Sequence, residues 1–170
     1  MSFKEKFIPD LFVPSVLKIR PEFFIENGID CLICDIDNTL ATYGEKLPQK
    51  DMLDWLNAVE ATGVRIGLIS NNSESRVYTF NTVLGYITVS RAMKPAKKKL
   101  LALIEQMDRK KENACLIGDQ IFTDVLCAKR AGIKAVLVRS IDTRGKPFLR
   151  FKKHFESYFM EEYYKNHPRY

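Results

Sequence analysis

Residues 30–40 read DCLICDIDNTL, and this stretch decides the fold. Its first half is a short apolar run bounded by polar residues, which predicts a buried β-strand over residues 29–34. The strand ends in two aspartates, Asp35 and Asp37, which are followed by residues typical of a turn. Two carboxylates at the tip of an apolar strand repel one another unless a cation lies near them.

The same kind of apolar run recurs along the chain and alternates with helical patterns. Further strands are predicted over residues 65–69, 86–89, 114–117 and 135–138. Two apolar stripes recur at helical spacing, namely Met52, Trp55, Leu56 and Val59, and Leu100, Leu103, Ile104 and Met107. Weaker helices are predicted over residues 74–84 and 123–131. This alternation indicates an α/β fold with a Rossmann-like, doubly wound parallel sheet.

The length of 170 residues fits a single domain. We expect an N-terminal extension (1–28) packing on the core, a catalytic core (29–140) and a basic, aromatic C-terminal helical tail (141–170). The tail has aromatic residues at helical spacing interleaved with cations: Phe148, Phe151, Phe155 and Phe159, with Arg150, Lys152 and Lys153. Such a helix either packs as ordinary core or lies on an anionic membrane.

Composition and charge limit the function less than the strand ends do. Hydrophobic residues make up 46% of the chain and charged residues 28%, as in an ordinary globular protein. The net charge of +6 is concentrated in residues 91–111 and 144–170, which are either solvated helix faces or a surface for nucleic acid or anionic lipid. The sequence also leaves open whether the protein forms a homo-oligomer. We expect a cytoplasmic protein, with peripheral membrane attachment as the alternative.

The four cysteines do not form a metal or redox site in this interpretation. Cys31 and Cys34 have C-x-x-C spacing, but both lie on the predicted strand, where positions three apart point to opposite faces. They therefore cannot bind one ion together. Reduced, buried thiols are expected instead.

Chemistry is expected where the strands end, because ligands of doubly wound sheets bind beyond the carboxyl ends of the strands. The candidate residues at these positions are Asp35, Asp37, Thr39, Ser70, Asn71, Lys94, Asp119 and Asp124. Taken singly, Asp-x-Asp is an ordinary turn, Ser70 a helix cap and Lys94 a solvated side chain. Several carboxylates at adjacent strand ends instead predict an oxygen-ligand site suited to Mg²⁺.

Four segments in this order resemble those of the haloacid dehalogenase (HAD) phosphatases. They are DxDxT at Asp35–Thr39, a hydrophobic strand ending in Ser70, the Lys94-Pro95 pair, and GDxxxxD at Gly118–Asp124. The match covers roughly residues 30–139. In detail the chain looks most like the YqeG-type branch, which is similar to the mitochondrial phosphatidylglycerophosphate phosphatases.

The resemblance implies a role for each candidate. Asp35 would be the nucleophile and form an aspartyl-phosphate, and Asp37 would be the general acid and base. Ser70 and Lys94 would hold the transferring oxygens, helped by Thr39 and by the backbone amide of Asn71.

The resemblance also implies Mg²⁺ as cofactor. Its ligands would be Asp35, the backbone carbonyl of Asp37 and Asp119, with Asp124 binding directly or through water. Because these residues follow strand ends, the ion is expected at the rim, with little effect on stability.

The segments 37–70 and 70–94 leave no room for a folded cap. A single domain with an open site suits large substrates, or a site closed by a neighbouring subunit. The expected activity is that of a Mg²⁺-dependent phosphomonoesterase, with phosphatidylglycerophosphate among the candidate substrates. The alternative, from another class, is an inactive HAD fold serving as an RNA- or membrane-binding module.

Overall fold

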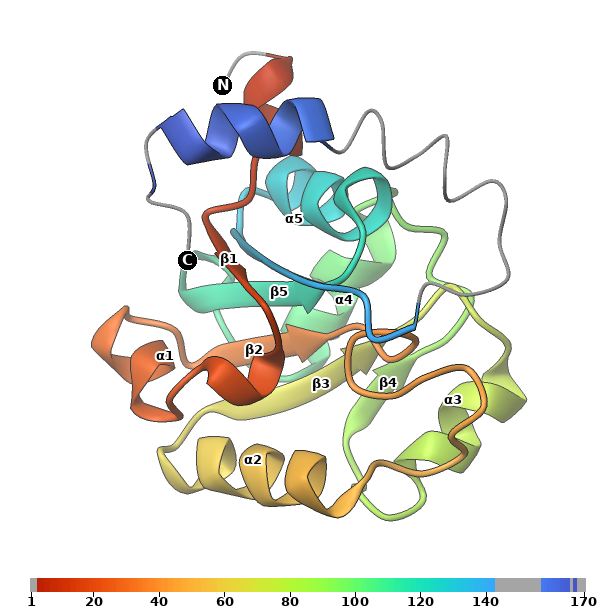
Figure 1. Ribbon diagram of the computed structural model, residues 1–170. Coiled ribbons are helices and arrows are strands. Elements are labelled where there is room, and N and C mark those ends of the chain that lie inside the picture. The colour runs from red at the N-terminus through yellow and green to blue at the C-terminus, as the bar shows by residue number, and fades with distance from the viewer. Residues whose placement is uncertain (1–2, 143–156, 166, 168–170) are drawn as a thin grey trace.

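The computed structural model describes residues 3–142, 157–165 and 167. Six strands form one sheet, and every neighbouring pair runs parallel (Figure 1). In spatial order they are β1 (Leu11–Val13), β6 (Lys134–Val138), β5 (Ala114–Gly118), β2 (Cys31–Cys34), β3 (Arg65–Ile69) and β4 (Ile87–Val89). The predicted α/β class with a parallel sheet is confirmed. All carboxyl ends meet at one edge, and β2 lies in the middle of it.

Strand β2 is buried on both faces. Cys31 and Ile33 point into one hydrophobic core, and Leu32 and Cys34 point into the other. This alternation follows from the two-residue period of a strand. It confirms that Cys31 and Cys34 cannot share an ion, and all four cysteines are free and buried.

Helices α2 (Lys50–Ala61) and α3 (Glu74–Asn81) pack on one face of the sheet, together with α1 (Glu22–Glu26) and the 3-10 turn η2 (Val16–Lys18). The predicted stripe on α2 is buried in this core. Trp55 also donates a hydrogen bond from Nε1 to the carbonyl of Ile19 at 2.8 Å, which ties the N-terminal segment to α2.

The opposite face carries α4 (Lys98–Gln106), α5 (Leu126–Ala131), the 3-10 turn η1 (Lys4–Phe7) and the π-helical turn η4 (Ile121–Val125). The short 3-10 turn η3 (Lys111–Asn113) leads into β5. The second predicted stripe, from Leu100 to Met107, is buried here. The helical segment predicted from residue 123 begins two residues earlier, because η4 precedes α5 directly.

Three local features differ from what the sequence pattern suggests. Strand β1 was not predicted, because Pro9 and Pro14 flank its three residues. As an edge strand it pairs on one side only, with β6, where nearby prolines are tolerated. A proline is common at the first position of a helix, but Pro95 lies in a turn after a cis peptide bond, and α4 begins at Lys98. Helix α3 ends at Asn81 rather than at residue 84.

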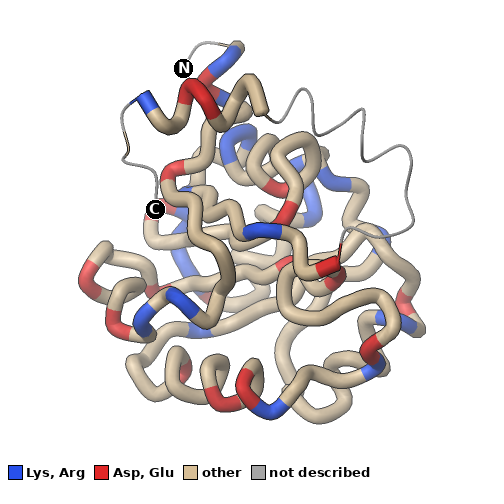
Figure 2. The backbone as a smooth tube through the Cα atoms, in the orientation of Figure 1, with Lys and Arg blue, Asp and Glu red and all other residues tan. Residues whose placement is uncertain are grey.

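In the C-terminal tail the structure describes a helix over residues 157–165, which packs near the N-terminus (Figure 1 and Figure 2). The ring of Phe159 stacks on that of Phe7 at 4.7 Å between centroids. The hydroxyl of Tyr163 accepts a hydrogen bond from the backbone N–H of Phe12 at 3.1 Å. The rest of the predicted tail stripe lies outside the described residues: Phe148, Phe151 and Phe155, with Arg150, Lys152 and Lys153. Among the residues described, none of the helices has the length and apolar character needed to cross a bilayer.

Candidate active site

The candidate residues converge at the carboxyl edge of the sheet. Asp35, Ser70 and Asp119 directly follow β2, β3 and β5. The sheet ladder continues into the first two, since the backbone N–H of Asp35 donates to Ile117 and that of Ser70 donates to Val89, both at 2.9 Å. The sheet therefore fixes the backbone from which these two side chains extend.

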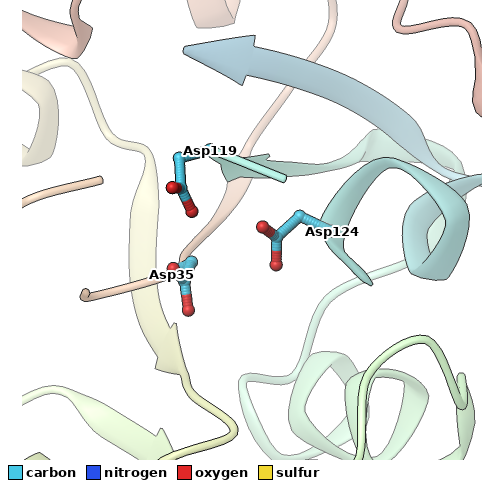
Figure 3. A group of neighbouring side chains, drawn as sticks. All are labelled: Asp35, Asp119 and Asp124. Atoms are coloured by element: carbon cyan, nitrogen blue, oxygen red, sulfur yellow. The ribbon is translucent and has the colours of Figure 1, made fainter. Parts of the chain in front are cut away.

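Three carboxylates meet at this edge, two just after β2 and β5 and one on η4 (Figure 3). One oxygen each of Asp35, Asp119 and Asp124 lies within 4.8 Å of the others. The Nζ of Lys94 enters the group and lies 2.6 Å from Oδ1 of Asp35 and 2.6 Å from Oδ1 of Asp124. The structure thus brings together the four charged residues that the sequence predicts after three different strands.

Burial shifts the pKa values of these charged groups. Burial raises the pKa of Asp35 to about 7; Lys94 opposes the shift, and Asp124 and Asp119 add to it. Burial, followed by the charge of Asp124, raises the pKa of Asp119 to about 6. For Lys94, burial lowers the pKa, but the two carboxylates outweigh burial and the net shift is upward. The lysine therefore stays charged at neutral pH.

The two carboxylate oxygens of Asp119 differ in their hydrogen bonding to the described residues. Its Oδ2 accepts a hydrogen bond from the hydroxyl of Ser140. Its Oδ1 is buried and accepts no hydrogen bond from the described residues. Gly118 leaves the space that Asp124 occupies, because a Cβ there would overlap the Asp124 side chain.

This group fits a divalent metal ion. With all three carboxylates ionised, the one ammonium leaves two negative charges, and oxygen ligands suit Mg²⁺. The Asp119 oxygen without a hydrogen-bond partner fits the same ion. The expectation of an exposed rim is wrong, since Asp35 is 5% exposed and Asp124 2%. A cation bound here would offset a buried charge imbalance, so it should affect stability.

The carboxylate of Asp37 lies outside this group of three. Its Oδ1 accepts a hydrogen bond from Nε of Arg76 at 3.0 Å. Its Oδ2 accepts hydrogen bonds from Nδ2 of Asn72 at 3.2 Å and from the Ser70 hydroxyl at 3.5 Å. That the backbone carbonyl of Asp37 binds the metal stays a prediction.

Two neighbours fix the nucleophile candidate and the lysine. The hydroxyl of Thr39, predicted to bind substrate, donates to Oδ2 of Asp35 at 3.3 Å. The Asn71 side chain accepts from the backbone N–H of Lys94 at 2.7 Å and donates to its carbonyl at 3.0 Å. Thr39 therefore orients Asp35. Asn71 holds the backbone of Lys94, whereas the backbone-amide role predicted for it stays a prediction.

A cleft of about 340 Å³ gives access to these residues. Its lining is formed by Asp35, Asp37, Tyr43, Ser70, Asn71, Asn72, Lys94, Gln120 and Thr123. Exposed apolar side chains flank this end of the sheet: Tyr43 (50% exposed), Met93 (73%) and Ile141 (51%). Between Asp37 and Lys94 the chain forms only α2, β3, α3 and β4 with their loops, so the predicted lack of a folded cap is confirmed.

Sequence reasoning missed Arg76, Asn72 and Ser140. One signal was present for Arg76: it is a cation in the first turn of α3, where the helix dipole disfavours positive charge. Asn72 and Ser140 carry no such signal, since polar residues after a strand are common in turns.

Aspartates after β2, a lysine after β4 and an acidic pair after β5, placed around one edge of a parallel sheet, define a HAD-like hydrolase. A family model described as HAD-hydrolase-like matches residues 92–155. The chain is 33% identical over 153 residues to "Probable phosphatase YqeG" of Bacillus subtilis (strain 168), with 90% of this chain and 89% of that protein covered. The chain therefore belongs to the HAD-like phosphatase family and is an enzyme of the phosphatase class.

Solved structures agree on the fold. An uncharacterized protein from Listeria monocytogenes serotype 4b has a TM-score of 0.56 at 19% identity, covering 69% of this chain and 85% of that one. CbbY from Rhodobacter sphaeroides has a TM-score of 0.53 at 13% identity, covering 69% of this chain and 90% of that one. At these identities the likeness supports the fold alone.

Proposed function

We propose that this protein is a Mg²⁺-dependent phosphomonoesterase that acts through an aspartyl-phosphate on Asp35. The observation that carries the proposal is the contact of Lys94 with Asp35 inside the group of three carboxylates. An anionic nucleophile must approach an anionic phosphate, and the ammonium reduces their repulsion.

In the first half-reaction a carboxylate oxygen of Asp35 forms a bond to phosphorus, and the bond from phosphorus to the leaving oxygen breaks. Asp37, as the general acid, gives a proton to that oxygen. In the second half-reaction Asp37 takes a proton from the water that attacks phosphorus, which frees Asp35 and inorganic phosphate.

The remaining site residues bind and orient the phosphoryl group. Ser70 lies beside Asp37, and its hydroxyl accepts a hydrogen bond from the backbone N–H of Asn72 at 3.0 Å, which fixes its position in the cleft. Mg²⁺, bound by Asp35, Asp119 and Asp124 with the carbonyl of Asp37, would supply positive charge for the transferring phosphoryl group.

Phosphate release from p-nitrophenyl phosphate with Mg²⁺ tests the activity. Asp35→Asn should lower kcat by about 10⁴-fold or more, as loss of a nucleophile does in other covalent catalysts. Near-native activity in Asp35→Asn would show that another group attacks. With this good leaving group, Asp37→Asn should accumulate the aspartyl-phosphate, which acid quenching and intact-mass measurement would detect.

For the substrate, we propose the phosphomonoester of a large alcohol, with phosphatidylglycerophosphate as the first candidate. The uncapped cleft and the exposed Tyr43 that lines it support this class, as do exposed Met93 and Ile141, which are the chain neighbours of Lys94 and Ser140. A phosphate-release screen should include phosphatidylglycerophosphate, glycerol phosphate, a sugar phosphate and a 5′-phosphorylated oligonucleotide. Faster turnover of either water-soluble small substrate than of the lipid would argue against the proposal.

The basic tail supports a related proposal, that the protein docks on an anionic membrane. Each cation near such a surface adds about 1 kcal/mol. Co-sedimentation with vesicles should rise with anionic lipid content and fall with salt. Joint neutralisation of Arg150, Lys152 and Lys153 should reduce it. Failure to bind such vesicles at low salt would leave the tail with a packing role only.

A further inference from the structure

We propose that Arg76 is a positioning residue for the proton-transfer step: it holds the carboxylate of Asp37 in the orientation from which the proton reaches the leaving oxygen. The inference rests on the proposed function, because it concerns the acid–base step at the same site. Its support is the ion pair between the two residues, which no strand-end motif predicts.

The Arg76–Asp37 contact is direct and shielded from solvent. Nε of Arg76 lies 3.0 Å from Oδ1 of Asp37, and the two side chains are 14% and 6% exposed. The second oxygen of Asp37 is bound by Asn72. With a donor on each oxygen, the carboxylate cannot rotate freely about its last bond.

Arg76 is itself fixed on its other sides. Its Nη2 donates to the carbonyl of Thr42 at 3.3 Å, and its Nη1 donates to that of Lys46 at 3.5 Å. Its guanidinium carbon lies 5.4 Å from the centroid of the Phe80 ring on the same helix. The guanidinium therefore links α3, Asp37 and the segment 42–46, and that segment carries Tyr43, which lines the cleft.

These contacts allow two interpretations. Arg76 either orients Asp37, or it merely fastens the segment 42–46 to α3. The two differ in the chemistry they affect. A proton from Asp37 is needed when the leaving oxygen is a strongly basic alkoxide, and it matters little when a stable phenolate leaves. Loosened packing alone would lower both reactions together.

The experiment compares Arg76→Met with the wild type on glycerol phosphate and on dinitrophenyl phosphate, both with saturating Mg²⁺. We expect the rate of the first half-reaction, measured as release of the alcohol in the first turnover, to fall by about 100-fold on glycerol phosphate, the scale of a misplaced catalytic group, and by less than about threefold on dinitrophenyl phosphate. Arg76→Lys should recover part of the loss, because one ammonium can reach Asp37 or the carbonyls but not all of them.

Arg65→Met is the matched control. Arg65 is the first residue of β3, at the opposite edge of the sheet, and its Nη1 donates to the carbonyl of Met107 at 2.8 Å. Its loss should affect stability and leave the ratio of the two rates unchanged. If Arg76→Met does not fold, Arg76→Lys and Arg76→Gln provide the same ratio.

A double-mutant cycle decides whether Arg76 acts through Asp37. In an Asp37→Asn background, Arg76→Met should cost no further rate on glycerol phosphate. An equal fall on both substrates, or full additivity in the cycle, would overturn the proposal and leave Arg76 a packing role. Failure of the proposed function would look different, since Asp35→Asn would then keep its activity on dinitrophenyl phosphate.

Discussion

The Nζ of Lys94 lies 2.6 Å from Oδ1 of Asp35, and both side chains are almost fully buried. The same nitrogen contacts Asp124. Breaking a buried pair by removing one partner leaves an uncompensated charge in the interior. Lys94 is therefore expected to hold the site together as well as to act in catalysis.

Lys94→Met should lower the free energy of unfolding by about 3–5 kcal/mol in chelator, measured by urea unfolding, because Asp35 and Asp124 lose their shared cation. Lys50→Met is the control. Its pair with Asp54 has the same 2.6 Å contact but lies in solvent, so stability should change little. Equal stability of the two variants would mean that the buried pair does not hold the site together.

Removing the metal should abolish activity and lower stability together. EDTA should silence the enzyme, and Mg²⁺ should restore activity and raise the free energy of unfolding, by about 2.7 kcal/mol at 100 times Kd. Asp119→Asn should shift both responses to higher Mg²⁺ concentration, since the site loses one charged oxygen ligand. Asp108→Asn, an exposed residue that lines a different cavity, should shift neither. Full activity in chelator would contradict the metal site.

The buried thiols should make stability depend on pH. Burial raises the pKa of Cys31 to about 12 and that of Cys127 to about 11, and it raises the pKa values of Cys34 and Cys115 well above the ordinary value. The unfolded chain loses these protons near pH 8.5, whereas the folded chain keeps them. Below that pH the buried thiols contribute fully to the free energy of unfolding. As pH rises above it this contribution is lost, by up to about 1.4 kcal/mol per pH unit for a fully buried thiol.

Urea unfolding at several pH values between about pH 8.5 and about pH 10 measures this dependence in the wild type and in Cys115→Ala. The free energy of unfolding should fall less steeply with pH in the variant, because one buried thiol has been removed. In the native protein at pH 8, all four thiols should react slowly with Ellman's reagent, because the thiolate is the reactive form. Fast labelling of Cys31 and Cys34 would reopen a redox role.

The sequence predicted the centre of the fold better than its margins. Strand β2 is a wholly apolar run with polar ends, and its two-residue period alone places Cys31 and Cys34 on opposite faces. Strand β1 has three residues between two prolines, and only its pairing with β6 makes it a strand. Local propensity does not contain that information, because a neighbouring strand far along the chain supplies it.

The site shows the same division. Asp35, Lys94, Asp119 and Asp124 follow strands that could be predicted, and topology alone brings them together. Arg76 comes from the helix after Ser70 and reaches Asp37 with a long side chain. Where such a side chain ends depends on packing, so its role became visible only in the structure.

Gly118 provides the last prediction, because it separates the geometry of the metal site from its charge. A Cβ at this position would overlap Cβ and Cγ of Asp124 and lie 2.5 Å from its Oδ2. Gly118→Ala should therefore push Asp124 away, lower Mg²⁺ affinity in calorimetry and cost about 1–3 kcal/mol of stability by overpacking. Gly67→Ala is the matched control: its Cβ would lie 2.7 Å from Sδ of Met107, at the flexible end of a side chain in the core. It should cost stability without changing Mg²⁺ affinity, and unaltered Mg²⁺ binding by Gly118→Ala would show that Asp124 is not needed in its present position.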